Sequence, residues 1–225
     1  MNLEHQHIHL TLPHAVLEGE LVLPHHSQGL VIFVAGCGSA AMASAGEIDQ
    51  QLYWSGFGTL TIDLLIESEC HYADAESHLP HLVERLLAVI AHLRRLMDSE
   101  SIAEQPIGLV AAGTATPVAA RVAALRDKEV KALVCHGGLI DLAGLQFLKV
   151  LQAPLLMIAD AEDERAATNL QRARPHNAAP VGFERLASED AGDEGSDKKN
   201  AGGTTTTANI AVAHTVRWFQ QHLRR

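Results

Sequence analysis

Aromatic side chains and cysteines are scarce in this chain of 225 residues. Phe, Trp and Tyr together make up 4% of the sequence, and there are three cysteines. The core must therefore be built from aliphatic side chains, which the 47% hydrophobic content can supply. An odd number of cysteines cannot all pair within one chain, so the count predicts a reducing compartment.

Positive charge is also in short supply, because 17 Lys and Arg face 27 Asp and Glu for a formal charge of -10. Binding to nucleic acid requires a basic surface, and no block of Lys or Arg occurs, so nucleic acid is excluded as an expected partner. The N-terminus lacks the apolar segment of a signal peptide, and the longest uncharged stretch, 105–120, is too short to cross a membrane. The sequence predicts a cytoplasmic protein without membrane contact.

Short apolar segments recur along the chain and predict strands. Residues 5–10 and 15–23 alternate between polar and apolar side chains, which is typical of an antiparallel hairpin with one buried face. Continuous apolar runs, typical of strands buried on both faces of a parallel sheet, then recur at 29–35, 58–65, 106–112, 130–135 and 154–159.

Segments with helical spacing separate these runs. The clearest is 78–97, where leucines, a valine and an isoleucine share one stripe and Pro80 falls in the first turn. Alternating strands and helices predict an α/β fold, with a mostly parallel central sheet flanked by helices and an N-terminal antiparallel hairpin. The whole chain, 1–225, is expected to form one domain.

One low-complexity segment, 187–208, contains small, polar and charged residues that cannot offset the entropy of ordering. It is expected to be a mobile loop, followed by a closing helix at 209–224. Its acidic part, 187–198, is a candidate contact for a basic partner protein.

Two loops rich in Gly and Ala follow predicted strands, where open α/β sheets bind ligands. They read AGCGSA from Ala35 and AAGTA from residue 111. This order of elements resembles the small α/β-hydrolases of the dienelactone-hydrolase-like group over nearly the whole chain. The segments that carry the resemblance are LVIFVAGCGSA, IGLVAAGTATPVAARVAAL, VKALVCHGGLIDLAG and APLLMIADAEDE. The resemblance implies an oxyanion-hole loop around Ala35, Gly36 and Cys37, and a nucleophile elbow at residues 111–115.

The chain departs from that family where the chemistry takes place. The nucleophile position falls on Gly113, which has no hydroxyl or thiol, and Ala35 stands where a histidine is usual. The neighbouring Thr114 would contribute its N–H to the oxyanion hole, with its side chain directed away. The resemblance places the acid after the fifth apolar run, near Asp160, Glu162 or Asp163. On the residues alone, these carboxylates read as a solvated turn.

The family's histidine belongs on the loop after the last strand, which contains none here. His176 precedes that strand, and His214 and His222 fall in the last helix. Loss of the nucleophile or the histidine typically lowers kcat by about 10⁶, roughly 8 kcal/mol of barrier. The catalytic site is therefore expected to be degenerate, with no cofactor and no metal.

Cysteine and histidine motifs elsewhere have simpler interpretations. Cys37 has no adjacent cation to lower its pKa and reads as a small apolar side chain. Cys135 and His136 are neighbours on one strand, so their side chains should point apart. His5, His7 and His9 share one strand face, but three ligands about 7 Å apart cannot hold one ion, which favours a polar surface.

These observations leave three functional hypotheses. The first is a noncatalytic binding or interaction module with an unknown small ligand or protein partner and an unknown oligomeric state. The second is an active ester or lactone hydrolase that uses carboxylates such as Asp63, Glu67, Glu69 or Asp163 to activate water. The third is a dinucleotide-binding protein, because the segment 36–41 resembles G-x-G-x-x-A and Asp63 ends the next strand. The first is preferred.

Overall fold

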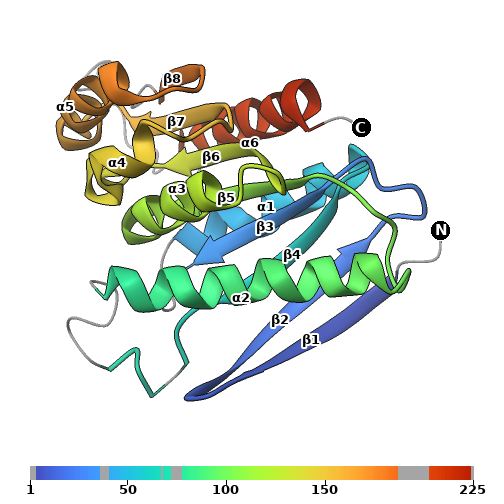
Figure 1. Cartoon of the computed structure of the whole chain (residues 1–225). Coiled ribbons are helices and arrows are strands. Elements are labelled where there is room, and N and C mark those ends of the chain that lie inside the picture. Colours follow the sequence, from blue (N-terminus) through green and yellow to red (C-terminus); the bar gives the residue numbers. More distant parts are fainter. Residues whose placement is uncertain (1–3, 36–40, 67, 72–77, 187–202, 224–225) are drawn as a thin grey trace.

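A single eight-stranded sheet organises the molecule (Figure 1). The computed structural model describes residues 4–35, 41–66, 68–71, 78–186 and 203–223. The strand order is β1-β2-β4-β3-β5-β6-β7-β8. The strands are β1 (Glu4–Leu12), β2 (Ala15–Leu23), β3 (Leu30–Ala35), β4 (Gly58–Asp63), β5 (Ile107–Ala112), β6 (Val130–His136), β7 (Leu155–Asp160) and β8 (Val181–Leu186).

The predicted hairpin and the parallel sheet are both confirmed. β1 and β2 pair antiparallel around the two-residue turn at Pro13 and His14, and β2 also pairs antiparallel with β4. All remaining strand pairs, from β4 to β8, are parallel. The apolar runs are buried on both faces because helices cover both sides, which explains why the sequence shows continuous apolar segments there.

Two helical layers enclose the sheet. One contains α2 (Leu79–Asp98), α3 (Thr116–Leu125), α4 (Leu145–Leu148) and α5 (Glu164–Ala173), whose apolar side chains belong to one core cluster. The other contains α1 (Ala41–Trp54) and α6 (Gly203–His222), packed in a second cluster on the opposite face. Figure 1 shows α2 in front of the sheet, with α1 and α6 behind it.

The stripe predicted on α2 forms a large part of the first cluster. Leu86, Ile90 and Leu93 are fully buried, and Pro80 lies in the first turn as expected. On the opposite face, Gly108 of β5 allows Phe219 of α6 to lie directly on the sheet, because a Cβ at Gly108 would overlap the phenylalanine ring. The absence of a side chain at Gly108 therefore sets how closely α6 approaches the sheet.

The structure corrects two expectations. Residues 203–208 form the first turns of α6, so the mobile loop predicted over 187–208 is wrong for that part, and 187–202 lie outside the described residues. The helix starts early because its backbone is continuous with the packed segment around Val212 and Phe219, which outweighs the weak helix propensity of the threonines.

The second correction concerns the cysteines. Cys70 is disulfide-bonded, whereas Cys135 is free and buried. The bond at Cys70 disagrees with the reducing compartment that the cysteine count predicts. The odd count remains compatible with one bond and one free thiol.

Candidate functional site

The carboxyl ends of the parallel strands meet at one edge of the sheet. Strand register places Ala35 beside Asp63 and Ala112 beside His136. Because every parallel strand ends at this edge, the loops that follow them are neighbours in space, which is where open α/β sheets hold their ligands. The sequence assigned its candidate residues to this same edge.

A sharp turn joins β5 to α3 at Gly113. Its φ is +54°, a left-handed conformation, and a single 3-10 turn, η2 (Gly113–Ala115), leads directly into α3. Among the described residues, no heavy atom outside its chain neighbours lies within 4 Å of the position that a Cβ on Gly113 would occupy. The strand–turn–helix geometry therefore presents residue 113 to a space that no described side chain fills, and Thr114 is exposed beside it.

A second pair of glycines, Gly137 and Gly138, lies against this turn. Both have positive φ, +66° and +85°, and follow β6 directly. The backbone of Gly138 packs on the carbonyl oxygen of Gly113, and the Thr116 hydroxyl donates a hydrogen bond of 2.9 Å to the Gly137 carbonyl. The ends of β5 and β6 are thus locked together at the turn.

Asp163 faces the same glycines from the end of β7. Its Oδ1 accepts a hydrogen bond of 2.9 Å from the Ala166 backbone N–H and so caps the N-terminus of α5. Its Oδ2 lies 3.6 Å from the position of a Cβ on Gly137. Asp160 and Glu162 are exposed beside it. Asp163 is therefore both a helix cap and a carboxylate directed at the turn region.

Cys135 and His136 point to opposite faces of β6, as predicted. Cys135 is fully buried against α3, and burial raises its pKa to about 12, with a smaller opposing effect from a hydrogen bond with Thr116. A thiol with such a pKa is not nucleophilic near neutral pH. The two side chains therefore do not activate each other.

His136 instead points towards α6. Its Nε2 lies 3.1 Å from the Thr215 hydroxyl, and that hydroxyl donates its proton to the Ala211 carbonyl. Because the hydroxyl has only one proton, the ring Nε2 must be the donor to Thr215. Burial lowers the His136 pKa to about 4, so the imidazole is neutral at physiological pH.

Other predicted residues are spread along the edge. Burial raises the pKa of Asp63, whereas the Arg85 guanidinium lowers the pKa of Glu69 through a two-pronged ion pair at 2.5 and 2.7 Å. Asp63 ends β4 beside Ala35, the place that the dinucleotide hypothesis requires. Gly36, Cys37 and Glu67 lie outside the described residues.

The histidine stripe on β1 is solvent-exposed, as predicted. His5 and His9 contact Glu20 and Glu18 across the hairpin, with Nδ1–Oε1 distances of 2.9 and 3.5 Å. Over the described ranges, no three His, Cys, Asp or Glu side chains lie close enough to hold a metal ion together. In the same ranges, none of the helices has the length and apolarity needed to traverse a lipid bilayer.

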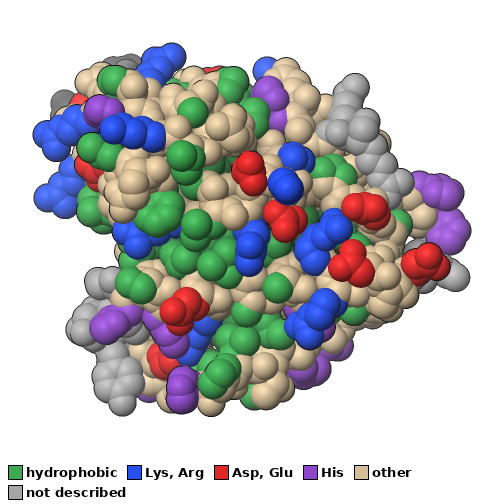
Figure 2. All heavy atoms as spheres, in the orientation of Figure 1, with side chains coloured by type: hydrophobic (Ala, Val, Ile, Leu, Met, Phe, Trp, Pro, Cys, Tyr) green, Lys and Arg blue, Asp and Glu red, His purple; other side chains and the backbone are tan. Residues whose placement is uncertain are grey.

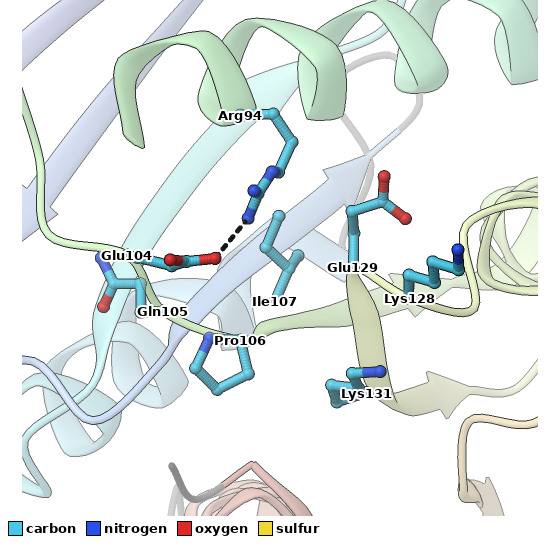
Figure 3. Close-up of a pocket in the computed structure, with 8 residues that line it drawn as sticks. All are labelled: Arg94, Glu104, Gln105, Pro106, Ile107, Lys128, Glu129 and Lys131. Atoms are coloured by element: carbon cyan, nitrogen blue, oxygen red, sulfur yellow. Dashed lines mark hydrogen bonds and ion pairs between the residues drawn. The ribbon is translucent and has the colours of Figure 1, made fainter. Parts of the chain in front are cut away.

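Two open cavities lie at the opposite edge of the sheet, where the strands begin. The larger, about 510 Å³, is lined by residues that precede or start β5 and β6, including Gln105, Ile107 and Lys128 (Figure 3). Figure 3 shows Arg94 directed at Glu104, while Lys128 and Lys131 point away from Glu104. Figure 2 likewise shows acidic and basic side chains interspersed over this face. About 20 Å of strand separates the cavity from Gly113, so it is not part of the turn region.

The sequence did not single out Gly137, Gly138, Thr215 or Arg85. Two consecutive glycines directly after a buried strand were the one available signal for the first pair, because only glycine adopts such conformations freely. Thr215 is 79 residues from His136, and Arg85 is 16 from Glu69, so no local pattern reveals either contact.

No family model matches this chain. Two curated proteins of Mycobacterium tuberculosis, from strains CDC 1551 and H37Rv, are provisionally described as phosphoribosyl transferases. Each is 32% identical to this chain over 157 residues, which is 69% of this chain and 34% of the relative. The chain thus spans about a third of the length of the curated relatives it matches.

Solved structures resemble the whole chain. A dienelactone hydrolase from Anabaena variabilis has a TM-score of 0.78 at 24% identity, with 99% of both chains covered. Est1E from Butyrivibrio proteoclasticus has a TM-score of 0.70 at 11% identity, covering 95% of this chain and 99% of its own. A cold-adapted esterase from an Arctic intertidal metagenomic library reaches 0.71 at 15% identity, covering 99% of this chain and 95% of its own. The chain therefore has the α/β-hydrolase fold, in the form seen in a dienelactone hydrolase.

Proposed function

We propose that this chain is a noncatalytic binding or interaction module built on the α/β-hydrolase fold. In this proposal the turn at Gly113 is the nucleophile elbow, without a nucleophile. The single observation that carries it is the left-handed φ of Gly113 together with the open space at its missing Cβ. The backbone and the space suit a reacting side chain, but the residue has none.

The histidines support the same conclusion. The segment that follows β8, residues 187–202, contains no histidine in its sequence. His176 ends the 3-10 turn η4 (Arg174–His176) before β8, and His214 lies within α6, 3.5 Å from Glu184. His136 is neutral and bound to Thr215 on the α6 side of the sheet. In this proposal none of these groups takes a proton from residue 113.

The open space above Gly113 suits a small ligand. Gly137 and Gly138 add no side chains to it, and Leu139, which follows them, is 37% exposed. Asp163 supplies one carboxylate oxygen next to Gly137. Such a surface favours a compact ligand that is mostly apolar, with one polar group.

The test combines an activity assay with a binding assay. We expect the purified chain to hydrolyse short acyl esters and lactones no faster than buffer. Butyrate and ethyl butyrate serve as probes for the space above Gly113 in ligand-observed NMR. Gly113→Leu would fill that space and abolish the signal. Gly46→Leu is the matched control, because Gly46 also has open space around it but lies on α1.

Hydrolysis above the buffer rate would overturn the noncatalytic proposal. It would favour the second candidate, a carboxylate-activated hydrolase, for which the raised pKa of Asp63 at the same edge is the supporting observation. Under that hypothesis Asp63→Asn removes the activity. Binding of both probes that survives Gly113→Leu would show that the ligand site lies elsewhere.

A further inference from the structure

Charge is distributed very unevenly between the two halves of the sheet. All 17 Lys and Arg residues lie at or beyond Arg85, whereas 11 of the 27 Asp and Glu residues precede it. The first 84 residues therefore carry a formal charge of -11 and the rest carry +1. These 84 residues form β1, β2, β4 and β3, which are contiguous in the sheet, together with α1. One half of the molecule is strongly acidic.

The outer strand of that half has an unprotected edge. β1 is nine residues long and pairs in unbroken register with β2 on one side, and no described strand pairs with it on the other. Proteins usually block such edges with lysine, proline or a bulge, and β1 (EHQHIHLTL) has none of these. The opposite outer strand, β8, is shorter and carries Arg185 and Glu184. Figure 1 shows β1 forming the border of the sheet.

The exposed face of β1 and β2 carries carboxylates and imidazole rings. Side chains of His5 and His9 are 48% and 63% exposed, and those of Glu20 and Glu18 are 53% and 74% exposed. Val16, further along the same face of β2, is 48% exposed. This part of the sheet is therefore open to solvent, although α1 and α6 cover the same face over the inner strands.

Asp49 borders this face from α1. Burial raises the pKa of its carboxyl, and a hydrogen bond with Thr59 of β4 opposes this shift. The charges of Glu20 and His5 have smaller effects on the same pKa. Its Oδ1 has no hydrogen-bond partner among the described residues. Three carboxylates, Glu18, Glu20 and Asp49, thus lie around the hairpin with no lysine or arginine among the first 84 residues to neutralise them.

We propose that an extended basic segment of a partner protein adds as a strand beside β1. The backbone groups of the segment would satisfy the open edge, as in other cases of strand addition. Alternate side chains of the added strand would project over the exposed face. Adjacent strands lie roughly 5 Å apart, so the long side chains of Lys and Arg can reach across β1 and approach Glu18 and Glu20 on β2. A second copy of this chain would bring two halves of formal charge -11 together, so charge complementarity selects a basic partner.

This inference does not depend on the function proposed for the turn at Gly113. β1 and β5, the strand that precedes Gly113, are separated in the sheet by β2, β4 and β3. Failure of the noncatalytic proposal would leave the edge of β1 unchanged, and failure here would leave the turn unchanged.

The experiment uses the full chain and a defined probe, a fluorescently labelled peptide of alternating Lys and Val residues that matches β1 in length. Binding is measured by fluorescence anisotropy at about 0.15 M salt, where screening removes long-range attraction. We expect saturable binding that weakens about tenfold or more in Glu18→Gln/Glu20→Gln. The control Glu47→Gln/Glu84→Gln has the same charge change in the same acidic half, on α1 and α2, and should bind as the unsubstituted chain does.

A second probe isolates strand addition. The same peptide with alternate backbone nitrogens methylated keeps its charge but cannot form a ladder on that side, and should bind about tenfold more weakly. Equal binding of the methylated peptide would overturn strand addition. Equal weakening in both pairs of variants, or no binding of the first peptide, would overturn the docking surface. Dimerisation through β1, seen as a doubled mass in light scattering, would also overturn it.

Discussion

The backbone of Gly138 lies directly on the carbonyl oxygen of Gly113, so the turn after β6 supports the turn after β5. Neither residue can gain a side chain without consequence, but the consequences differ. At Gly113 the surrounding space is open, whereas at Gly138 a Cβ would overlap both that oxygen and the Thr116 side chain. A side chain at Gly113 would therefore meet backbone strain alone, whereas one at Gly138 would meet both backbone strain and steric overlap.

Gly138→Ala should lower the free energy of unfolding by about 3 kcal/mol, because a φ of +85° strains an L-residue and the new methyl group displaces the Gly113 backbone. Gly137→Ala is the matched control. Its φ is +66° and its closest neighbour, Asp163 Oδ2, is 3.6 Å away, so strain alone should cost about 1 kcal/mol. Urea unfolding of both variants measures the difference, and equal losses would contradict the packing of Gly138 on Gly113.

Gly113→Ser should lower the free energy of unfolding by only about 1–2 kcal/mol, because the left-handed backbone is strained but the side chain meets open space. The variant should remain inactive towards acyl esters, since under the noncatalytic proposal no histidine activates the hydroxyl. Thermal melting and an ester assay on one preparation check both statements. Ester turnover by this variant would show that a base lies within reach of residue 113.

The extent to which sequence reveals such features depends on how local they are. The apolar runs located the five inner parallel strands, β3 to β7, to within a few residues, because each is a short segment buried on both faces. α1 was not singled out, since AMASAGEIDQQLYW mixes small, polar and apolar residues without a clear stripe. Gly113 could be assigned because strand, turn and helix are consecutive. The contact between His136 and Thr215 could not, because the fold alone brings β6 and α6 together.

That contact makes His136 a source of pH-dependent stability. Burial lowers its pKa to about 4 in the folded chain, against an ordinary value of 6.5. The unfolded chain therefore binds the proton first, so stability is complete above pH 6.5 and falls as the pH decreases towards 4, by up to about 3 kcal/mol. His136→Gln keeps an N–H donor for Thr215 and does not titrate. Its unfolding free energy should fall less over this window, and parallel pH profiles for the two chains would contradict the burial of a neutral imidazole.

Arg85 and Glu69 form the ion pair whose loss should be most costly. The Arg85 side chain is 3% exposed and also donates a 2.6 Å hydrogen bond to the Leu64 carbonyl, so it holds the segment after β4 against α2. Arg85→Met should destabilise the chain by about 3 kcal/mol, because it leaves a partly buried carboxylate and a carbonyl without their donor. Arg185→Met removes the 2.6 Å pair with Glu164, whose side chains are 41% and 75% exposed, and should cost less than about 1 kcal/mol.

The same pair also fixes the sign of an acid effect. The Arg85 guanidinium lowers the Glu69 pKa in the folded chain, so the pair stabilises fully above the ordinary carboxyl range and is lost as the pH falls through the lowered value. Glu69→Gln should therefore be less stable than the unsubstituted chain at neutral pH, and this difference should shrink as the pH falls below about 4.5. Urea unfolding of the two chains at neutral and acidic pH measures this, and a stability difference that stays constant on acidification would show that Glu69 gains nothing from Arg85.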